Sequence, residues 1–330
     1  MKQILMIATG GTIASKEGGD GLTPAMTGEE LAANVPGIEK KCDLTVLQLM
    51  NIDSTNMRPR QWLMISEAIL SHYDNYDGFV VLHGTDTMAY TASMLSFMLA
   101  GIRIPVVLTG AQYPAVYPDS DGRRNLENAI IAATALTGGV YICFGNSLML
   151  GCRAVKTRTT SLNAFESINY PYIGTVSDGR MLALHSPQVR SEYSFSTDID
   201  PRVALIKLIP GLSPKLLDCC LDCDIKGVVV EAFGLGGMHS IRRNHLKAIE
   251  RLMANDIPVI LTSQCLYEQS TPDIYEVSRP LKELGIISAG DMTTEAAITK
   301  LMWVLGHTSG IDGVRNMMQT NLVGELTQKD

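Results

Sequence analysis

The chain has 330 residues, more than one hydrophobic core usually supports, so two domains are expected. With 46% hydrophobic and 18% charged residues, its composition is ordinary for a soluble enzyme. A formal net charge of -7 without a long basic block argues against nucleic acid as the main partner, and no apolar run is long enough to span a bilayer.

Cysteine usage and the first residues bear on the compartment. Seven cysteines, an odd number, fit a reducing environment better than a disulfide framework. The apolar run 4–8 is too short for a signal-peptide core, so we expect a cytoplasmic protein. Cys219, Cys220 and Cys223 lack the second cysteine pair or nearby histidine of a zinc site, and we interpret them as residues of an amphipathic helix.

Strand-like and helix-like segments alternate from the first residues onward. Thr27 and Glu30 have the spacing of a capping box and mark the start of a helix. Continuous apolar strands indicate burial on both faces, and the alternation predicts right-handed βαβ units around a parallel or mixed sheet flanked by helices. Strands are expected at 4–8, 44–50, 78–82, 105–109 and 139–144, and helices at about 59–73, 87–101 and 125–137.

The regular alternation is lost between about 163 and 201, where proline, glycine and serine are frequent. It resumes with strands at 203–209, 227–232 and 258–262 and a helix at 294–305. We therefore predict a two-domain α/β protein with a larger N-terminal domain over 1–185, a linker over 186–202 and a smaller C-terminal α/β domain over 203–330.

Two turns rich in glycine and threonine directly follow apolar strands: Thr9-Gly10-Gly11-Thr12 and His83-Gly84-Thr85-Asp86-Thr87. In parallel sheets, ligands collect beyond the carboxyl ends of the strands. Either turn alone has a plainer interpretation, because glycine suits a tight turn and Thr12 could simply cap a helix. Together, with Asp86 beside Thr85, they favour a shared site for nucleophilic chemistry.

The side chains expected at the strand ends are hydroxyls, carboxylates and an amide: Thr9, Thr12, Asp53, Ser54, Thr85, Asp86 and Gln112. Such a pocket suits a small polar substrate that carries an amino group and an amide or a carboxylate. Asp53 and Asp86 could pair with a substrate ammonium, and backbone N–H groups of the two turns could hold a carboxylate or an oxyanion.

A threonine hydroxyl needs a base to become a useful nucleophile. His83 precedes its turn and is expected to pack into the sheet. Lys156 is the other candidate: it is a base if buried and deprotonated, and otherwise a solvated surface charge. The cluster Gly234-Leu235-Gly236-Gly237 is a weak signal for a dinucleotide loop, because the third glycine of that fingerprint is misplaced.

Several of these segments resemble the motifs of bacterial-type L-asparaginases. Residues 8–15 and 82–90, which contain the two turns, are similar to the two signature segments of that family. Because the chain shows no signal peptide, it is similar to the cytoplasmic, type I branch of that family. The likeness continues through Asn51-Ile52-Asp53-Ser54, Thr109-Gly110-Ala111-Gln112, Lys156, Gln264-Cys265, Tyr275-Glu276-Val277 and Gly290-Asp291-Met292-Thr293-Thr294-Glu295-Ala296.

This resemblance implies hydrolysis of L-asparagine to L-aspartate and ammonia in two steps, without a metal or an organic cofactor. Thr12 matches the nucleophile that forms an acyl-enzyme. Thr85, Lys156 and Asp86 match a second hydroxyl-amine-carboxylate triad that supports proton transfer.

The resemblance also implies how the substrate is held. Asp86 matches a ligand of the substrate ammonium and Ser54 a ligand of its α-carboxylate, while backbone groups at Thr85 and Ala111 help to hold the amide and the oxyanion. The predicted substrate-binding residues are Asp53, Ser54, Gly84, Thr85, Asp86 and Ala111.

By the same resemblance, we expect a homodimer or homotetramer in which the partner's C-terminal domain completes each site. Tyr275 is the residue expected from that partner. The alternative is a core tyrosine near Val277.

Two departures from the family pattern stand out. Many relatives carry a tyrosine in the loop after the first threonine, and here Leu22 takes its place, so Tyr275 is a candidate for that role. Glu231 stands where some type I relatives have an arginine of an allosteric asparagine site, and Val155 replaces a polar neighbour of the lysine, although Cys265 remains. We expect weak or absent allostery by that mechanism.

Three other functions compete with the asparaginase hypothesis. A related transamidosome subunit deamidates glutamine for charged transfer RNA, but it carries an extra N-terminal domain, whereas the first turn here begins within ten residues of Met1. A non-catalytic amino-acid sensor would not need two hydroxyls and an amine together. A nicotinamide oxidoreductase rests only on the Gly234 cluster.

Overall fold

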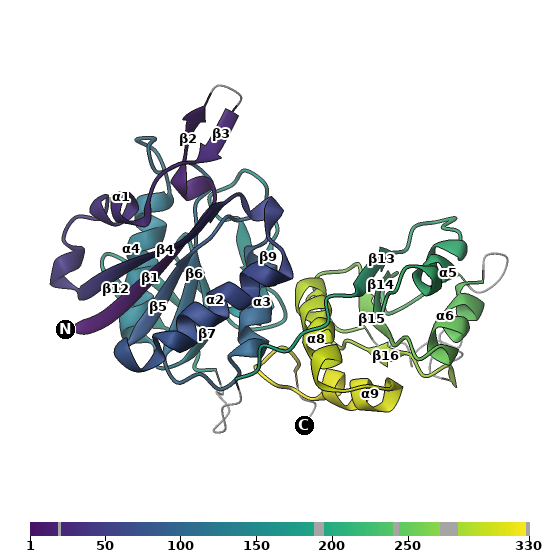
Figure 1. The fold of residues 1–330 in the computed structure, drawn as a ribbon. Coiled ribbons are helices and arrows are strands. Elements are labelled where there is room, and N and C mark those ends of the chain that lie inside the picture. Colours follow the sequence, from purple (N-terminus) through teal and green to yellow (C-terminus); the bar gives the residue numbers. More distant parts are fainter. Residues whose placement is uncertain (19–20, 188–194, 240–243, 271–282, 328–330) are drawn as a thin grey trace. The chain divides into compact units, whose positions relative to one another are not determined.

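The computed structural model describes residues 1–18, 21–187, 195–239, 244–270 and 283–327. The chain forms two compact units, Met1–Thr197 and Asp198–Asp330. The boundary between them lies inside the segment 186–202 that we interpret as a linker. Each unit has its own sheet flanked by helices, so the predicted two-domain α/β architecture is confirmed (Figure 1).

The larger unit is built around an eight-stranded sheet in the order β12-β11-β8-β7-β6-β5-β1-β4. Five neighbouring strands are parallel and three further strands pair antiparallel at one side. The parallel strands are β1 (Lys2–Gly10), β4 (Cys42–Ile52), β5 (Gly78–Leu82), β6 (Pro105–Thr109) and β7 (Gly139–Phe144). The antiparallel ones are β8 (Ser147–Leu150), β11 (Gly174–Ser177) and β12 (Arg180–Ala183).

Helices cover both faces of this sheet, which explains why β5 and β6 are buried along their whole length and are apolar except for Thr109 at the end of β6. Figure 1 shows α2 and α3 in front of the strands and α4 behind them. The Thr27 hydroxyl accepts a hydrogen bond from the backbone N–H of Glu30 at the first helix, as the capping box predicts. The helices are α1 (Gly28–Ala33), α2 (Pro59–Ser71), α3 (Met88–Met98) and α4 (Gly122–Ala135).

Two short strand pairs lie outside the main sheet and outside the predicted pattern. The hairpin of β2 (Ser15–Gly18) and β3 (Gly21–Pro24) directly follows the first turn. The strand β9 (Ala154–Lys156) pairs with β10 (Phe165–Ser167). The stretch 163–201 contains the short strands β10, β11 and β12, which pair antiparallel and do not continue the strand–helix alternation.

The smaller unit contains a four-stranded parallel sheet in the order β13-β14-β15-β16. Leu217 and Ile249 of α5 and α6 pack in one core with Val228 and Val230. On the other face, an added Cβ at Gly227 would lie 2.8 Å from Leu301 of α8. The strands are β13 (Val203–Lys207), β14 (Gly227–Ala232), β15 (Val259–Ser263) and β16 (Ile287–Ser288), and the described helices are α5 (Lys215–Asp222), α6 (His245–Ala254), α8 (Thr294–His307) and α9 (Ile311–Gln319).

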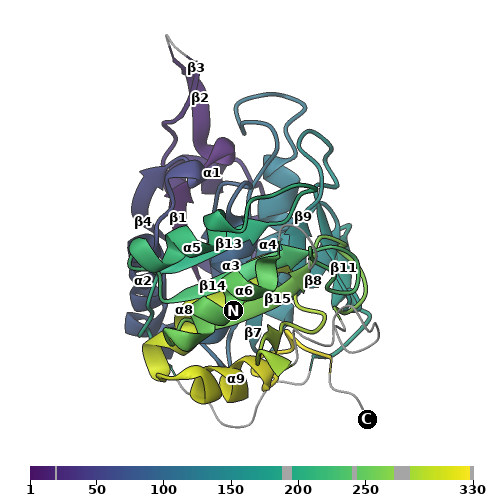
Figure 2. The same ribbon diagram turned by 90° about the vertical axis from the view of Figure 1, so that its right-hand side faces the viewer.

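Figure 2 shows β13, β14 and β15 side by side in that order. Cys219 and Cys220 lie in α5, as the amphipathic pattern predicts, and Cys223 directly follows the helix. All three are free thiols. No helix within the described residues has the length and apolar character that a membrane span requires.

Candidate active site

Three turns at the carboxyl edge of the parallel strands lie in direct contact. Gly11 has a φ of 83°, and a Cβ added there would lie 2.4 Å from the backbone of Gly84. A Cβ added at Gly84 would in turn lie 2.5 Å from Ser54 Oγ. The glycines therefore allow the turns after β1, β4 and β5 to approach closely, which brings Thr12, Ser54 and Thr85 to one region.

Thr12 opens a short 3-10 turn, Thr12–Ala14, and is half-buried. The cap position of this turn is Gly11 and has no side-chain hydrogen bond, so Thr12 is not the helix cap that the plainer interpretation assumed. The turn is fixed by the Ser15 hydroxyl, which donates to Gly11 O at 3.2 Å, and by Ala115 N–H, which donates to Ile13 O at 3.1 Å.

Lys156 joins the second turn through its amine. It ends β9, and its Nζ donates to Thr85 Oγ1 at 2.8 Å and to Asp86 Oδ1 at 2.6 Å. The Lys156 side chain is only 17% exposed, whereas that of Asp86 is 56% exposed. The alternative of a solvated surface lysine is therefore wrong, and the hydroxyl-amine-carboxylate group exists as a structural unit.

Gln112 and Ala111 follow β6 in a loop that buried polar groups hold in place. An added Cβ at Gly110 would lie 2.2 Å from His83 O, so this loop also lies against the second turn. The backbone N–H of Gln112 donates to both carboxylate oxygens of Asp121 at 3.1 Å. Asn125 of α4 donates to Gly110 O and to Asp121 Oδ2, both at 2.9 Å.

The side chains of two predicted strand-end residues, Thr9 and Asp53, form hydrogen bonds with nearby protein groups. Thr9 is buried and its hydroxyl donates to Leu82 O at 2.6 Å, which links β1 to β5. Asp53 Oδ1 accepts from the backbone N–H and the hydroxyl of Thr55, both at 2.8 Å, and its residue is exposed. Of this pair, only Asp53 belongs to the predicted substrate-binding set.

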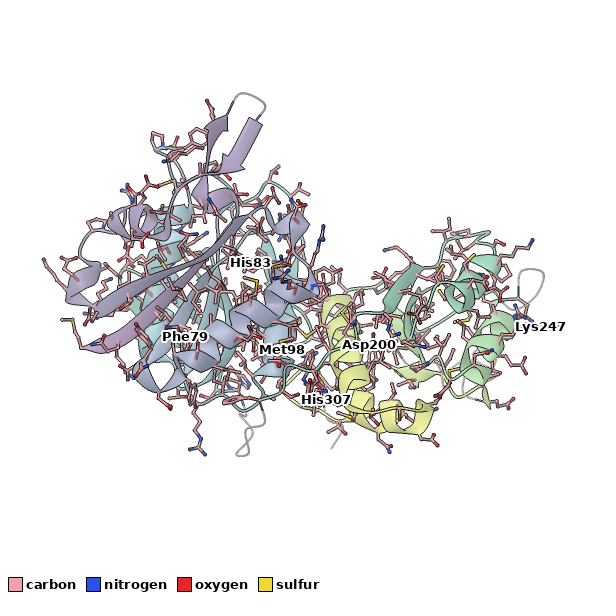
Figure 3. All side chains as sticks on the ribbon, viewed as in Figure 1. Phe79, His83, Met98, Asp200, Lys247 and His307 are labelled. Atoms are coloured by element: carbon pink, nitrogen blue, oxygen red, sulfur yellow. The ribbon has the colours of Figure 1, made fainter. Side chains whose placement is uncertain are left out.

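His83 packs inside the unit, as expected, and not in the candidate site. Figure 3 shows Phe79 and His83 at opposite ends of β5. Nδ1 of His83 contacts Gly84 O at 2.7 Å, and Nε2 contacts Thr91 Oγ1 at 2.9 Å, to which Trp62 Nε1 also donates. Complete burial lowers the pKa of His83 to about 4, so the ring is neutral at pH 7.

Sequence reasoning missed a contact between the hairpin and the loop after β6. The Tyr117 hydroxyl donates to Glu17 Oε1 at 2.8 Å, and this hydrogen bond is the main cause that raises the pKa of Tyr117. It also missed Asp121 and Asn125, whose i, i+4 spacing at the start of a predicted helix was the available signal. Tyr275 lies outside the described residues, and so does the side chain of Leu22.

The remaining candidates lie in the smaller unit. Gly234 and Gly236 form a tight turn in which Gly237 N–H donates back to Phe233 O at 2.7 Å. Within the described residues, the next helix after this turn is α6, which begins at His245, and the interpretation as a dinucleotide loop is therefore not supported. Glu231 accepts from Thr294 Oγ1 at 2.7 Å and pairs with Lys207 at 3.3 Å.

Among the described residues, no group of three or more histidine, cysteine, aspartate or glutamate side chains is placed to hold a metal ion. The larger unit instead presents threonine, lysine and aspartate groups at the carboxyl edge of a parallel sheet. This fold, with polar groups gathered at the carboxyl edge of a parallel sheet, defines an α/β enzyme.

Comparisons with known proteins identify the family. Residues 3–189 match the family described as "Asparaginase, N-terminal", and residues 202–318 match "Glutaminase/Asparaginase C-terminal domain". The chain belongs to the asparaginase family of amidohydrolases.

Similar proteins match the chain nearly end to end. An L-asparaginase from Thermococcus kodakarensis is 41% identical over 98% of this chain and 99% of its own length, and its solved structure superposes with a TM-score of 0.94 over 99% and 100% of the two chains. L-asparaginase I from Vibrio cholerae is 32% identical, with a TM-score of 0.88 over 99% of each chain. A subunit of the glutamyl-tRNA(Gln) amidotransferase from Pyrococcus abyssi is 38% identical over 99% of this chain and 77% of its own length.

Proposed function

We propose that the protein hydrolyses L-asparagine to L-aspartate and ammonia, with Thr12 as the nucleophile. The observation that carries this proposal is the placement of Lys156 Nζ between Thr85 Oγ1 and Asp86 Oδ1, beside the Gly11–Gly84 contact. The similarity to L-asparaginases over nearly the whole chain supports the choice of substrate.

The substrate has three polar groups to satisfy. Asp86 is half-exposed and offers a carboxylate to the α-ammonium group, and Ser54 beside Gly84 supplies a hydroxyl for the α-carboxylate. Backbone N–H groups at Thr85 and Ala111 are proposed to polarise the side-chain amide carbonyl. Asp53 offers its second carboxylate oxygen to the ammonium group, because Oδ1 is engaged by Thr55.

The reaction then proceeds through an acyl-enzyme. Thr12 Oγ1 bonds to the amide carbon and loses its proton, and the C–N bond breaks as the departing nitrogen gains one. Water next adds to the ester carbon, L-aspartate leaves and the proton returns to Thr12. Thr85 and Lys156 are proposed to carry these protons, while Asp86 keeps the lysine in place.

Ammonia release from L-asparagine tests the proposal. Thr12→Ala and Thr85→Val are each expected to lower kcat by roughly three orders of magnitude or more. Thr45→Ala is the matched control, because Thr45 is an exposed threonine of β4 in the same unit and is expected to keep wild-type activity. A wild-type protein without ammonia release, or a fully active Thr12→Ala variant, would contradict it.

Hydrolysis of L-glutamine is the second candidate, because one similar protein is a glutamyl-tRNA(Gln) amidotransferase subunit and the matched C-terminal family is described as glutaminase/asparaginase. The two side chains differ by one methylene, which a pocket distinguishes by about 1–3 kcal/mol. Ammonia release from L-glutamine in parallel assays decides the preference. An amino-acid sensor would instead bind asparagine without turnover.

We further propose a cytoplasmic homodimer or homotetramer in which Tyr275 of a partner subunit reaches the site near Thr12. Light scattering of the purified protein tests the assembly.

A further inference from the structure

The Thr85 hydroxyl contacts both Lys156 and Gln112. Thr85 Oγ1 accepts from Lys156 Nζ at 2.8 Å and donates to Gln112 Oε1 at 3.4 Å. The Thr85 residue is 4% exposed, so bulk water has little access to this hydroxyl. Two protein groups therefore set the direction of its single proton.

The orientation of the Gln112 amide follows from its other partners. Its Nε2 donates to Thr159 O at 3.0 Å and to Ser161 O at 3.1 Å. The flipped amide is excluded, because it would place the Gln112 oxygen against these two carbonyl oxygens, and none of the three can donate a hydrogen bond. The group that faces Thr85 must be the amide oxygen, which accepts but cannot donate. The backbone N–H bonds to Asp121 keep this residue in place.

A hydroxyl oxygen has one proton and two acceptor positions. At Thr85 the lysine amine occupies one acceptor position and the Gln112 oxygen attracts the proton. What remains for a ligand is a lone pair. An amide NH₂ group can donate to that lone pair, whereas a carboxylate oxygen meets it with repulsion.

We infer that Gln112 is a positioning residue that orients the Thr85 proton, so that the site favours the side-chain amide of the substrate over the carboxylate of the product. This inference rests on the proposed function. The 3.4 Å contact is longer than an ordinary O–H···O bond, so it biases the hydroxyl without locking it. As the C–N bond breaks, the nitrogen becomes an acceptor and the hydroxyl is free to turn toward it.

The variant Gln112→Met tests the inference. Methionine has a similar length to glutamine but no amide oxygen that could accept from the Thr85 hydroxyl. The measured quantity is the inhibition constant of L-aspartate divided by KM for L-asparagine. We expect Gln112→Met to lower this ratio by about twofold to fivefold, the worth of one weak hydrogen bond.

Gln48→Met is the matched control. The Gln48 amide also donates to two backbone carbonyls, of Met50 and Ala8, and accepts from Gly28 N–H, but it contacts no proposed catalytic residue. This variant should keep the wild-type ratio. A change in stability alone would move kcat or the unfolding midpoint without changing the ratio.

The outcomes separate this inference from the proposed function. If the wild-type enzyme is active and the ratio is unchanged in Gln112→Met, or is lowered equally in Gln112→Met and Gln48→Met, only the role of Gln112 is overturned. A wild-type protein that releases no ammonia from L-asparagine overturns both.

Discussion

The chemistry of single residues in this protein depends on which polar groups face the strand ends and which face inward. His83 and Thr85 are two residues apart, yet only Thr85 contacts the lysine amine, while the His83 ring bonds to Gly84 O and Thr91. Sequence reasoning could place both residues at a strand end, because the apolar run of β5 is unambiguous. Sequence reasoning could not select Lys156, because its contacts with Thr85 and Asp86 join residues that are 71 and 70 positions apart in the chain.

Acidification is expected to destabilise the larger unit through His83. Its pKa is about 4 in the folded protein and near 6.5 when unfolded, so between these values only the unfolded chain gains the proton. The free energy of unfolding therefore falls as the pH drops from about 6.5 to 4, by about 3 kcal/mol in total. The pKa of His83 in the folded protein can be measured by NMR titration of the imidazole signals. The His83 signal is assigned by its loss in the variant His83→Gln. A His83 ring that titrates near pH 6.5 would contradict the prediction.

At the scale of elements, the hairpin β2–β3 is held by contacts at its base and by Tyr117. Tyr117→Phe removes only the hydroxyl that donates to Glu17. We expect hydrogen exchange of the β2 amides to accelerate about fivefold, as the loss of one exposed hydrogen bond implies, with little change in global stability. Tyr113→Phe is the control, because Tyr113 lies in the same loop and is exposed. Equal exchange in both variants would show that Tyr117 does not anchor the hairpin.

A second element-scale prediction concerns the buried ion pair of the smaller unit. Lys300 Nζ contacts Glu325 Oε1 at 2.5 Å, and both side chains are fully buried. Glu325 also accepts from the backbone N–H groups of Leu322 and Val323, so the pair fixes the segment after α9. Lys300→Met should leave a buried carboxylate without its cation and cost about 3–5 kcal/mol in urea unfolding. The double variant with Glu325→Leu should recover part of this loss, and a Lys300→Met protein of wild-type stability would contradict the argument.

The central strands of the two sheets could be predicted from the sequence more reliably than the edge strands and the surface loops. Strands buried on both faces, such as β6 and β14, have continuous apolar runs, and their predicted bounds agree with the structure within a residue. The edge strand β12 has mostly exposed side chains, so its four residues do not differ in pattern from a loop. The contact between Tyr117 and Glu17 could not be predicted from the sequence either, because it joins a loop and a hairpin that are 100 residues apart in the chain.

The last prediction concerns the assembly, in which we propose that Tyr275 serves the site of a partner subunit. Thr12→Ala and Tyr275→Phe should each lower activity when present in every subunit. A hybrid dimer of the two variants has one site that combines an intact Thr12 with an intact Tyr275, because the two defects fall together in the other site. Hybrids purified through two different tags should therefore recover about half of the wild-type kcat per dimer, as expected for a symmetric, shared interface. If Tyr275 acted within its own subunit, each hybrid would hold two defective sites and remain as inactive as its parents.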